Sequence, residues 1–146
     1  MSEARARPEI EAIAALSAIQ ARLRARMERA LPPGVSAAAF EALEQLARSQ
    51  APGGPADLAA ALGLSRAALT HTLARLEAAR WVAMSADPGD GRRKRLTLTS
   101  SGAETYRTCL RATRAERESL RAAVSPWAAE SALPFLRSLE AWLTRS

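Results

Sequence analysis

Four consecutive basic residues, Arg92-Arg93-Lys94-Arg95, follow the turn Asp87-Pro88-Gly89-Asp90-Gly91. A cation at the tip of a hairpin can enter the minor groove of duplex DNA, where negative potential is concentrated. We expect Asp90 to pair with the guanidinium of Arg92 and to fix its direction. Charged side chains also protect exposed strand edges. Four in succession exceed that need, so the run favours a nucleic-acid contact.

A second constellation precedes this run. Ala59, Gly63 and Leu69 have the spacing of a helix-turn-helix. That motif needs a small residue where two helices cross, a residue that tolerates positive φ in the turn, and an apolar anchor on the second helix. Ordinary helical hairpins meet the same needs, so this spacing alone favours a helix-turn-helix only slightly.

The outward face of the second of these helices strengthens the interpretation. If Leu69, Leu73 and Leu76 are buried, the opposite face contains no acid to repel phosphates. Its small residues would allow close approach to base edges, and the amides near its start could meet a phosphate. The residues expected at the major groove are Ser65, Arg66, Ala67, Thr70, His71 and Arg75, with Arg92 in the minor groove and Arg93 and Lys94 near phosphates. For His71, a solvated surface histidine is an equally good interpretation.

The charge of the chain is concentrated in the same region. The formal net charge is +6. Residues 66–95 carry seven basic groups and three acids, for +4, whereas residues 1–65 sum to zero and residues 96–146 to +2. Such a concentrated positive field favours a polyanionic partner, of which nucleic acid is the commonest.

Helices must position most of these side chains, because apolar residues recur at three-to-four spacing. Prolines, glycines and capping residues mark where the helices begin and end. The pattern predicts a helix from Pro8 to Ala30, a second capped by Ser36 and ended by the loop 50–55, a short third from Pro55 to Gly63, and a fourth capped by Ser65.

The periodicity then changes. Residues 81–84 and 95–98 are predicted strands of the one hairpin that the sequence indicates. Thr99 is expected to cap a long helix to about Val124, and Ser125-Pro126 to start a last helix that Pro134 kinks or delays. The predicted fold is mainly α with a small β-hairpin wing.

Composition excludes several classes. One Cys and one His cannot form a disulfide or a zinc site, and three Asp, two of them inside the basic hairpin, leave no evident acid–base pair. We therefore expect neither an enzyme nor a cofactor. The few aromatic residues are too scattered to stack single-stranded nucleic acid. The chain has no apolar run that could span a membrane and no signal-peptide pattern at its N-terminus, so a single cytoplasmic domain without membrane contact is expected.

The motifs of residues 57–102 resemble those of the multiple-antibiotic-resistance regulator (MarR) family. The similarity extends over about residues 35–124 and includes Asp90-Gly91-Arg92, which matches the family's Asp-x-Arg wing, and Leu98-Thr99-Ser100-Ser101-Gly102, which matches its Leu-Thr-x-x-Gly exit from the wing. Gly91, His71 and Ala68 depart from residues common in the family. These departures alter base reading but leave the phosphate-binding parts in place.

The resemblance implies a winged helix-turn-helix homodimer that binds pseudo-palindromic double-stranded DNA, usually as a repressor, and that a small aromatic or phenolic effector often releases. Residues 35–98 would be the winged helix-turn-helix, 99–124 a linking helix, and 1–34 with 125–146 the dimerisation helices. The expected dimer contacts are Ile10, Ile13, Leu16, Trp127, Leu133, Leu136, Leu139, Trp142 and Leu143. The same apolar residues could instead cover the monomer's own core.

Three further expectations concern binding. By analogy with the family, an apolar pocket would lie between the second and fifth helices, although nothing in the sequence identifies its occupant. Cys109 has neighbouring arginines that could lower its pKa, but a small buried hydrophobe is the favoured interpretation. The alternative function is a winged-helix protein-interaction module without DNA binding, which the run at residues 92–95 disfavours because protein interfaces seldom concentrate like charges.

Overall fold

A computed structural model describes residues 7–49 and 53–145. The chain forms two compact units, one ending at Ala112 and the other beginning at Thr113, which are described separately. The expectations about the extreme N-terminus and about residues 50–52 of the loop before the third helix lie outside the described residues.

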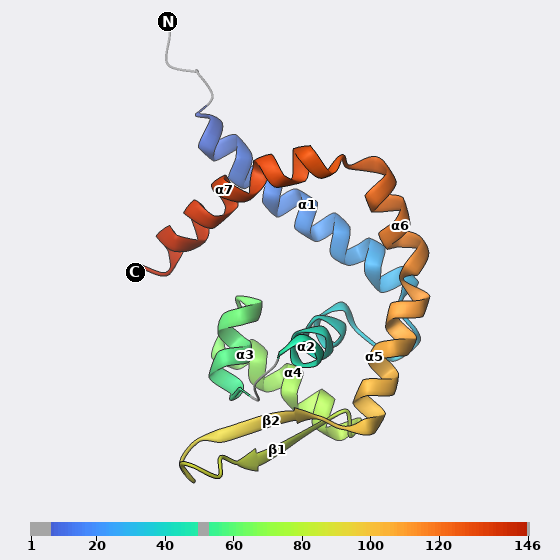
Figure 1. Cartoon of the computed structure of the whole chain (residues 1–146), viewed down its shortest axis with the longest axis vertical. Helices are drawn as coiled ribbons and strands as arrows, with labels where there is room; N and C mark the ends of the chain where they lie inside the picture. Colours follow the sequence, from blue (N-terminus) through green and yellow to red (C-terminus); the bar gives the residue numbers. More distant parts are fainter. Residues whose placement is uncertain (1–6, 50–52, 146) are drawn as a thin grey trace, which may run out of the picture. The chain divides into compact units, whose positions relative to one another are not determined.

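The first unit contains five helices and one hairpin in its described part (Figure 1). Their bounds are α1 Pro8–Ala30, α2 Ala37–Arg48, α3 Pro55–Leu62, α4 Arg66–Ala78, β1 Val82–Ala86, β2 Lys94–Leu98 and α5 Ser100–Ala112. The bounds of α1 match the prediction at both ends. The strands begin at Val82 and Lys94, each one residue from the predicted start.

Hydroxyl caps define several helix starts, as predicted. Ser36 Oγ accepts a hydrogen bond from the Ala39 amide at 3.2 Å, and Ser65 Oγ accepts one from the Ala68 amide, also at 3.2 Å. Each bond satisfies an amide that the first turn of a helix leaves without an intrahelical partner. These caps fix where α2 and α4 begin.

The core of the first unit has two parts. The larger gathers apolar side chains of α2, α3, α4 and the hairpin around Leu43, Leu76 and Leu96, each at most 1 % exposed. The smaller joins α2 to α5 through Phe40 and Cys109. The rings of Phe40 and Tyr106 stack with centroids 6.0 Å apart. Side chains of α2 and α5 therefore contact each other in the region where the resemblance implied an effector pocket.

The second unit contains α6, Arg114–Ala123, and α7, Pro126–Leu143. The prediction of one continuous helix from Thr99 to about Val124 was wrong, because helical geometry breaks at Thr113 (φ −89°, ψ 4°). Threonine is β-branched, and its hydroxyl competes for backbone partners, so it tolerates such a break better than most residues. The start of α7 is not delayed: Ser125 caps it at the Ala128 amide, and the helix continues through Pro134.

None of the helices in the described ranges is long and apolar enough to cross a membrane.

Candidate nucleic-acid interface

Helix α4 presents the side chains that the sequence assigned to the major groove. Leu69, Leu73 and Leu76 are buried, as predicted, and Thr72 joins them at 9 % exposure. The six residues expected to face outward are all exposed: Arg66, Ala67, Thr70, His71, Ala74 and Arg75. None of these six residues carries a carboxylate.

The turn between α3 and α4 sets the direction of α4. Gly63 has left-handed geometry (φ 61°, ψ 31°), and the Leu64 amide donates to the Ala59 carbonyl at 2.9 Å. This is a glycine helix end of the kind that lets the chain reverse sharply. The predicted role of Gly63 is confirmed, and α3 and α4 pack against each other across the turn.

The hairpin, here called the wing (residues 82–98), has a regular antiparallel register that pairs Val82 with Leu98 and Met84 with Leu96. At its tip, the Asp87 amide donates to the Arg93 carbonyl and the Arg93 amide donates to the Asp90 carbonyl, both at 2.9 Å. These bonds close a compact loop that exposes Arg92, Arg93 and Lys94. In residues 7–49 and 53–145 these three cations have no acidic partner, so their charge is available to a ligand.

The acidic residues of the wing differ from the prediction in one respect. Asp90 Oδ1 accepts from the backbone amide of Arg92 at 3.1 Å, so it shapes the loop and does not hold the guanidinium. The arginine that pairs with an acid is Arg95, whose Nη2 lies 3.4 Å from Asp87 Oδ2. The bidentate pair expected between Asp90 and Arg92 was therefore wrong. A carboxylate two residues before an amide readily forms such a local turn, which competes with a side-chain ion pair.

Asp87 anchors the loop electrostatically. Its Oδ1 accepts from the Gly89 amide at 2.8 Å. This bond, followed by the charge of Arg95, lowers the pKa of the Asp87 carboxyl below its ordinary value. The sequence analysis missed the ion pair of Asp87 with Arg95. The available signal was that the two residues lie on opposite sides of the predicted hairpin turn, eight residues apart.

The base of the wing is fastened on two sides. The Leu96 amide donates to the Gly53 carbonyl at 2.9 Å, which ties β2 to the residues just before α3. On the other side, Thr99 Oγ1 donates to the Arg80 carbonyl at 2.7 Å and accepts from the Gly102 amide at 2.9 Å. Thr99 therefore caps α5, as predicted, and also bonds the turn that follows α4. The direction of the wing relative to α4 is fixed by these contacts.

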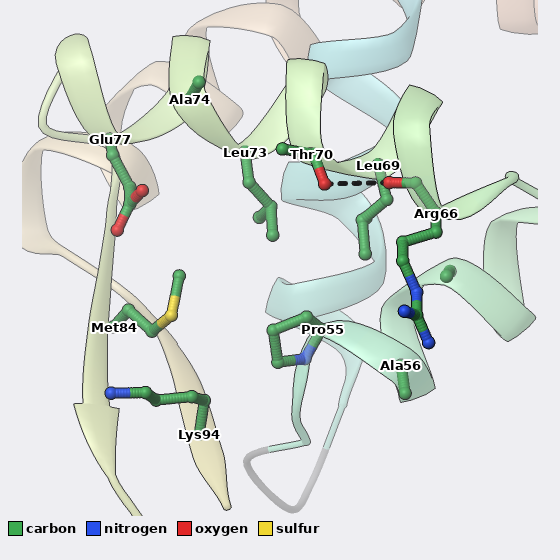
Figure 2. Close-up of a pocket in the computed structure, with 11 residues that line it drawn as sticks. Pro55, Ala56, Arg66, Leu69, Thr70, Leu73, Ala74, Glu77, Met84 and Lys94 are labelled. Carbon is green, nitrogen blue, oxygen red and sulfur yellow. Dashed lines mark hydrogen bonds between the residues drawn. The ribbon is translucent and has the colours of Figure 1, made fainter.

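A cavity of about 680 Å³ lies between α4 and the wing (Figure 2). The start of α3, the face of α4 from Arg66 to Glu77, and Met84 and Lys94 of the wing form its walls. No sequence pattern indicated this cavity, because its walls come from three elements whose spacing depends on the fold.

Most of the residues expected at a dimer interface are exposed. Ile10, Trp127 and Trp142 are 58 %, 77 % and 64 % exposed, and neither α1 nor α7 has a buried residue. The exposed members also include Ile13, Leu133 and Leu143, whereas Leu16, Leu136 and Leu139 are half-buried. The pattern missed Phe135, a further exposed apolar residue of α7.

Cys109 does not belong to the exposed surface. It is fully buried, and burial raises the pKa of its thiol. A thiol with a raised pKa contains little of the reactive thiolate near neutral pH. This is the environment expected of a cysteine that packs as a small hydrophobe.

A family model described as MarR family matches residues 34–93, which include α2, α3, α4 and most of the wing. The chain therefore resembles the MarR family over this segment. The match covers every residue expected to contact DNA except Lys94.

Several solved structures of DNA-binding proteins have a similar fold. They include the MOSR regulator of Mycobacterium tuberculosis in complex with DNA (24 % identity, TM-score 0.74, covering 89 % of this chain and 96 % of that one). A mutant MarR of E. coli complexed with operator DNA is similar at 24 % identity (TM-score 0.68, 87 % and 94 % covered). The BpsR regulator of Bordetella bronchiseptica, whose DNA binding is regulated by 6-hydroxynicotinic acid, is 23 % identical (TM-score 0.72, 88 % and 98 % covered). Among curated proteins, no sequence matches this chain.

Proposed function

We propose that this protein is a MarR-family repressor that binds pseudo-palindromic double-stranded DNA as a homodimer. The observation that carries the proposal is the arrangement of two cationic surfaces: the exposed residues 66–75 of α4, among which there is no acid, and the exposed cations at residues 92–94 of the wing. The α4 face suits the major groove, where small side chains permit close approach. The wing suits the adjacent minor groove, which attracts arginine.

Each protomer would read one half-site. Ser65, Arg66, Ala67, Thr70, His71 and Arg75 face the major groove, Arg92 enters the minor groove, and Arg93 and Lys94 bind phosphates. Asp90 contributes by shaping the loop that presents Arg92. The DNA complexes of the MOSR and MarR relatives support this assignment at the level of the fold.

Dimerisation is part of the proposal because one helix reads too few base pairs for useful specificity. A two-fold dimer places two recognition helices about 34 Å apart, one turn of B-form DNA. Residues 1–34 and 125–146 would form the dimerisation region, residues 35–98 the DNA-binding region and residues 99–124 the link. The exposed apolar side chains of α1 and α7 support this division, since exposed apolar patches often mark protein–protein interfaces.

The last part of the proposal is that a small ligand controls DNA binding. BpsR responds to 6-hydroxynicotinic acid, and we propose that a small aromatic or phenolic effector likewise lowers the affinity of this protein for its operator.

The test is selection of DNA from a random duplex pool by the purified protein, followed by titration of the enriched sequence at several salt concentrations. We expect an inverted repeat with half-sites one helical turn apart and an affinity that falls steeply with salt. A transcription assay with that sequence in the promoter should show reduced transcript. Retention of no duplex at low salt would contradict the proposal and favour a protein-interaction module.

A further inference from the structure

Asp90 and Gly91 form an Asp–Gly step, a dipeptide at which aspartate readily isomerises. The side-chain carboxyl carbon of an aspartate can be attacked by the backbone nitrogen of the next residue, which closes a five-membered imide ring. Glycine allows this closure because it has no Cβ to obstruct the ring and adopts backbone conformations that other residues resist. The sequence contains three aspartates and no asparagine, so few positions can react in this way.

The three aspartates differ in the amide that follows them. Asp87 precedes Pro88, whose nitrogen carries no hydrogen. Asp57 precedes the buried Leu58, whose amide donates a backbone hydrogen bond of 3.2 Å in the first turn of α3. Gly91 is exposed, and within the described ranges its amide makes no hydrogen bond. The Asp–Gly step is therefore the place where an aspartate can react.

The loop of the wing holds the two reacting groups together. Asp90 Oδ1 accepts from the Arg92 amide at 3.1 Å, and this bond closes a ring of atoms that contains both Asp90 Cγ and the Gly91 nitrogen. The attacked carbon and the attacking nitrogen are therefore kept near each other. An added Cβ at Gly91 would meet nothing within 4 Å, so the loop also has space for the imide ring.

We propose that Asp90 converts spontaneously to isoaspartate and that this modification inactivates the wing. In the first step the Gly91 nitrogen forms a bond to Asp90 Cγ, and the carboxyl hydroxyl leaves with the amide hydrogen as water. In the second step water adds to the former backbone carbonyl of Asp90 and breaks its bond to the Gly91 nitrogen. The main chain then runs through Cβ and Cγ, and a free α-carboxylate remains. Water is released once and consumed once, so no other reactant is needed.

The modified loop cannot keep the hydrogen bonds that now shape it. Asp90 accepts from the Arg92 amide through Oδ1 and from the Arg93 amide through its carbonyl oxygen, the latter at 2.9 Å. Isoaspartate lengthens the main chain by one carbon atom and turns that carbonyl into a carboxylate, so both acceptors move. The net charge is unchanged, so a loss of DNA binding would come from geometry. That loss rests on the proposed function, because it requires Arg92 and Arg93 to contact DNA.

The chemical step is measured on the purified full-length protein, incubated warm at neutral pH. A methyltransferase specific for isoaspartate labels the new α-carboxylate with a radioactive methyl group, and peptide mapping locates the label. We expect label at Asp90 and none at Asp57 or Asp87. No label in wild type would overturn the site.

Two glycine variants of the same loop provide the controls. Gly91→Ala should suppress the label, because the added Cβ obstructs the imide ring, whereas Gly89→Ala should leave the label unchanged. The new Cβ meets nothing within 4 Å at Gly91 and comes no closer than 3.4 Å to its neighbour at Gly89, so both variants should fold. Equal label in wild type and Gly91→Ala would also overturn the site.

Loss of DNA binding is measured separately from the label. In aged wild type the fraction of protein that binds the selected duplex should fall one for one with the isoaspartate content, and aged Gly91→Ala should keep its activity. Label without loss of binding would overturn inactivation of the wing. If fresh protein binds no duplex at all, the proposed function fails, yet the labelling still decides whether Asp90 isomerises.

Discussion

Asp87 Oδ2 lies 3.4 Å from Arg95 Nη2 across the end of the wing, where the two strands diverge into the loop. The other carboxylate oxygen accepts from the Gly89 amide at 2.8 Å. The Asp87 side chain therefore joins β2 to the loop that presents Arg92 and Arg93. The order of the loop that we propose contacts DNA depends on a residue that has no predicted DNA contact.

The Asp87 link predicts a pH dependence of the wing. Because the folded-state pKa of Asp87 is depressed, its contribution is fully present above the ordinary value of 3.8 and is lost as pH falls through the lowered pKa. The protection factors of the Gly89 and Arg93 amides against hydrogen exchange should fall over that acid range. Asp87→Asn should show fast exchange already at neutral pH and no further change on acidification. Slow exchange in this variant would show that Asp87 does not order the loop.

Arg92 should contribute to DNA affinity through the minor groove. Arg92→Ala should cost about 1–3 kcal/mol of binding, or roughly 5- to 150-fold, measured by fluorescence anisotropy on the selected duplex. Arg121→Ala removes the same charge from an exposed position on α6 and serves as the control. Equal losses in the two variants would remove the assignment of Arg92.

Arg93 should act differently, because a phosphate contact carries no sequence information. Arg93→Ala should weaken specific and non-specific duplexes alike and reduce the slope of log affinity against log salt by roughly one. An unchanged slope would mean that Arg93 does not bind a phosphate.

Leu143 tests the dimer. Leu143 is 60 % exposed on the apolar side of α7, and Leu143→Glu should shift sedimentation from twice the 15.6 kDa chain mass towards the monomer. The physical reason is the cost of burying a carboxylate without a partner. Ala141→Glu places the same group on the opposite side of α7 and should leave the dimer intact. A monomeric wild type would contradict the interface outright.

Gly102 should be essential for the junction of the wing with α5. A Cβ atom there would lie 2.0 Å from the Trp81 carbonyl oxygen, a backbone atom that cannot easily move. Gly102→Ala should therefore lower stability by about 1–3 kcal/mol or more. Gly91→Ala meets nothing within 4 Å and should change stability by about 0.5 kcal/mol or less. Thermal unfolding followed by circular dichroism checks both variants, and equal midpoints would contradict the close approach.

Local rules predicted the elements well because they act over a few residues. Ser36 and Ser65 cap helices where their hydroxyls reach an amide three residues on, and Gly63 ends α3 because it tolerates positive φ. The same rules failed at Thr113, where the helical pattern continues through a break. They also assigned the wrong acid to the ion pair of the wing. Asp90 bonds a backbone amide of the loop, whereas Asp87 pairs with Arg95, and only the pairing of the two strands brings those two residues together.

The sequence by itself determined the helical elements, the hairpin, the buried and outward faces of α4 and the concentration of positive charge. These features follow from side-chain periodicity, capping and formal charge, which need no knowledge of distant residues. Only the tertiary structure decided that Asp87 pairs with Arg95, that Gly102 lies against Trp81, and that α3, α4 and the wing enclose a cavity. Each of these depends on the packing of segments separated in the chain, and no local pattern encodes a distance between them.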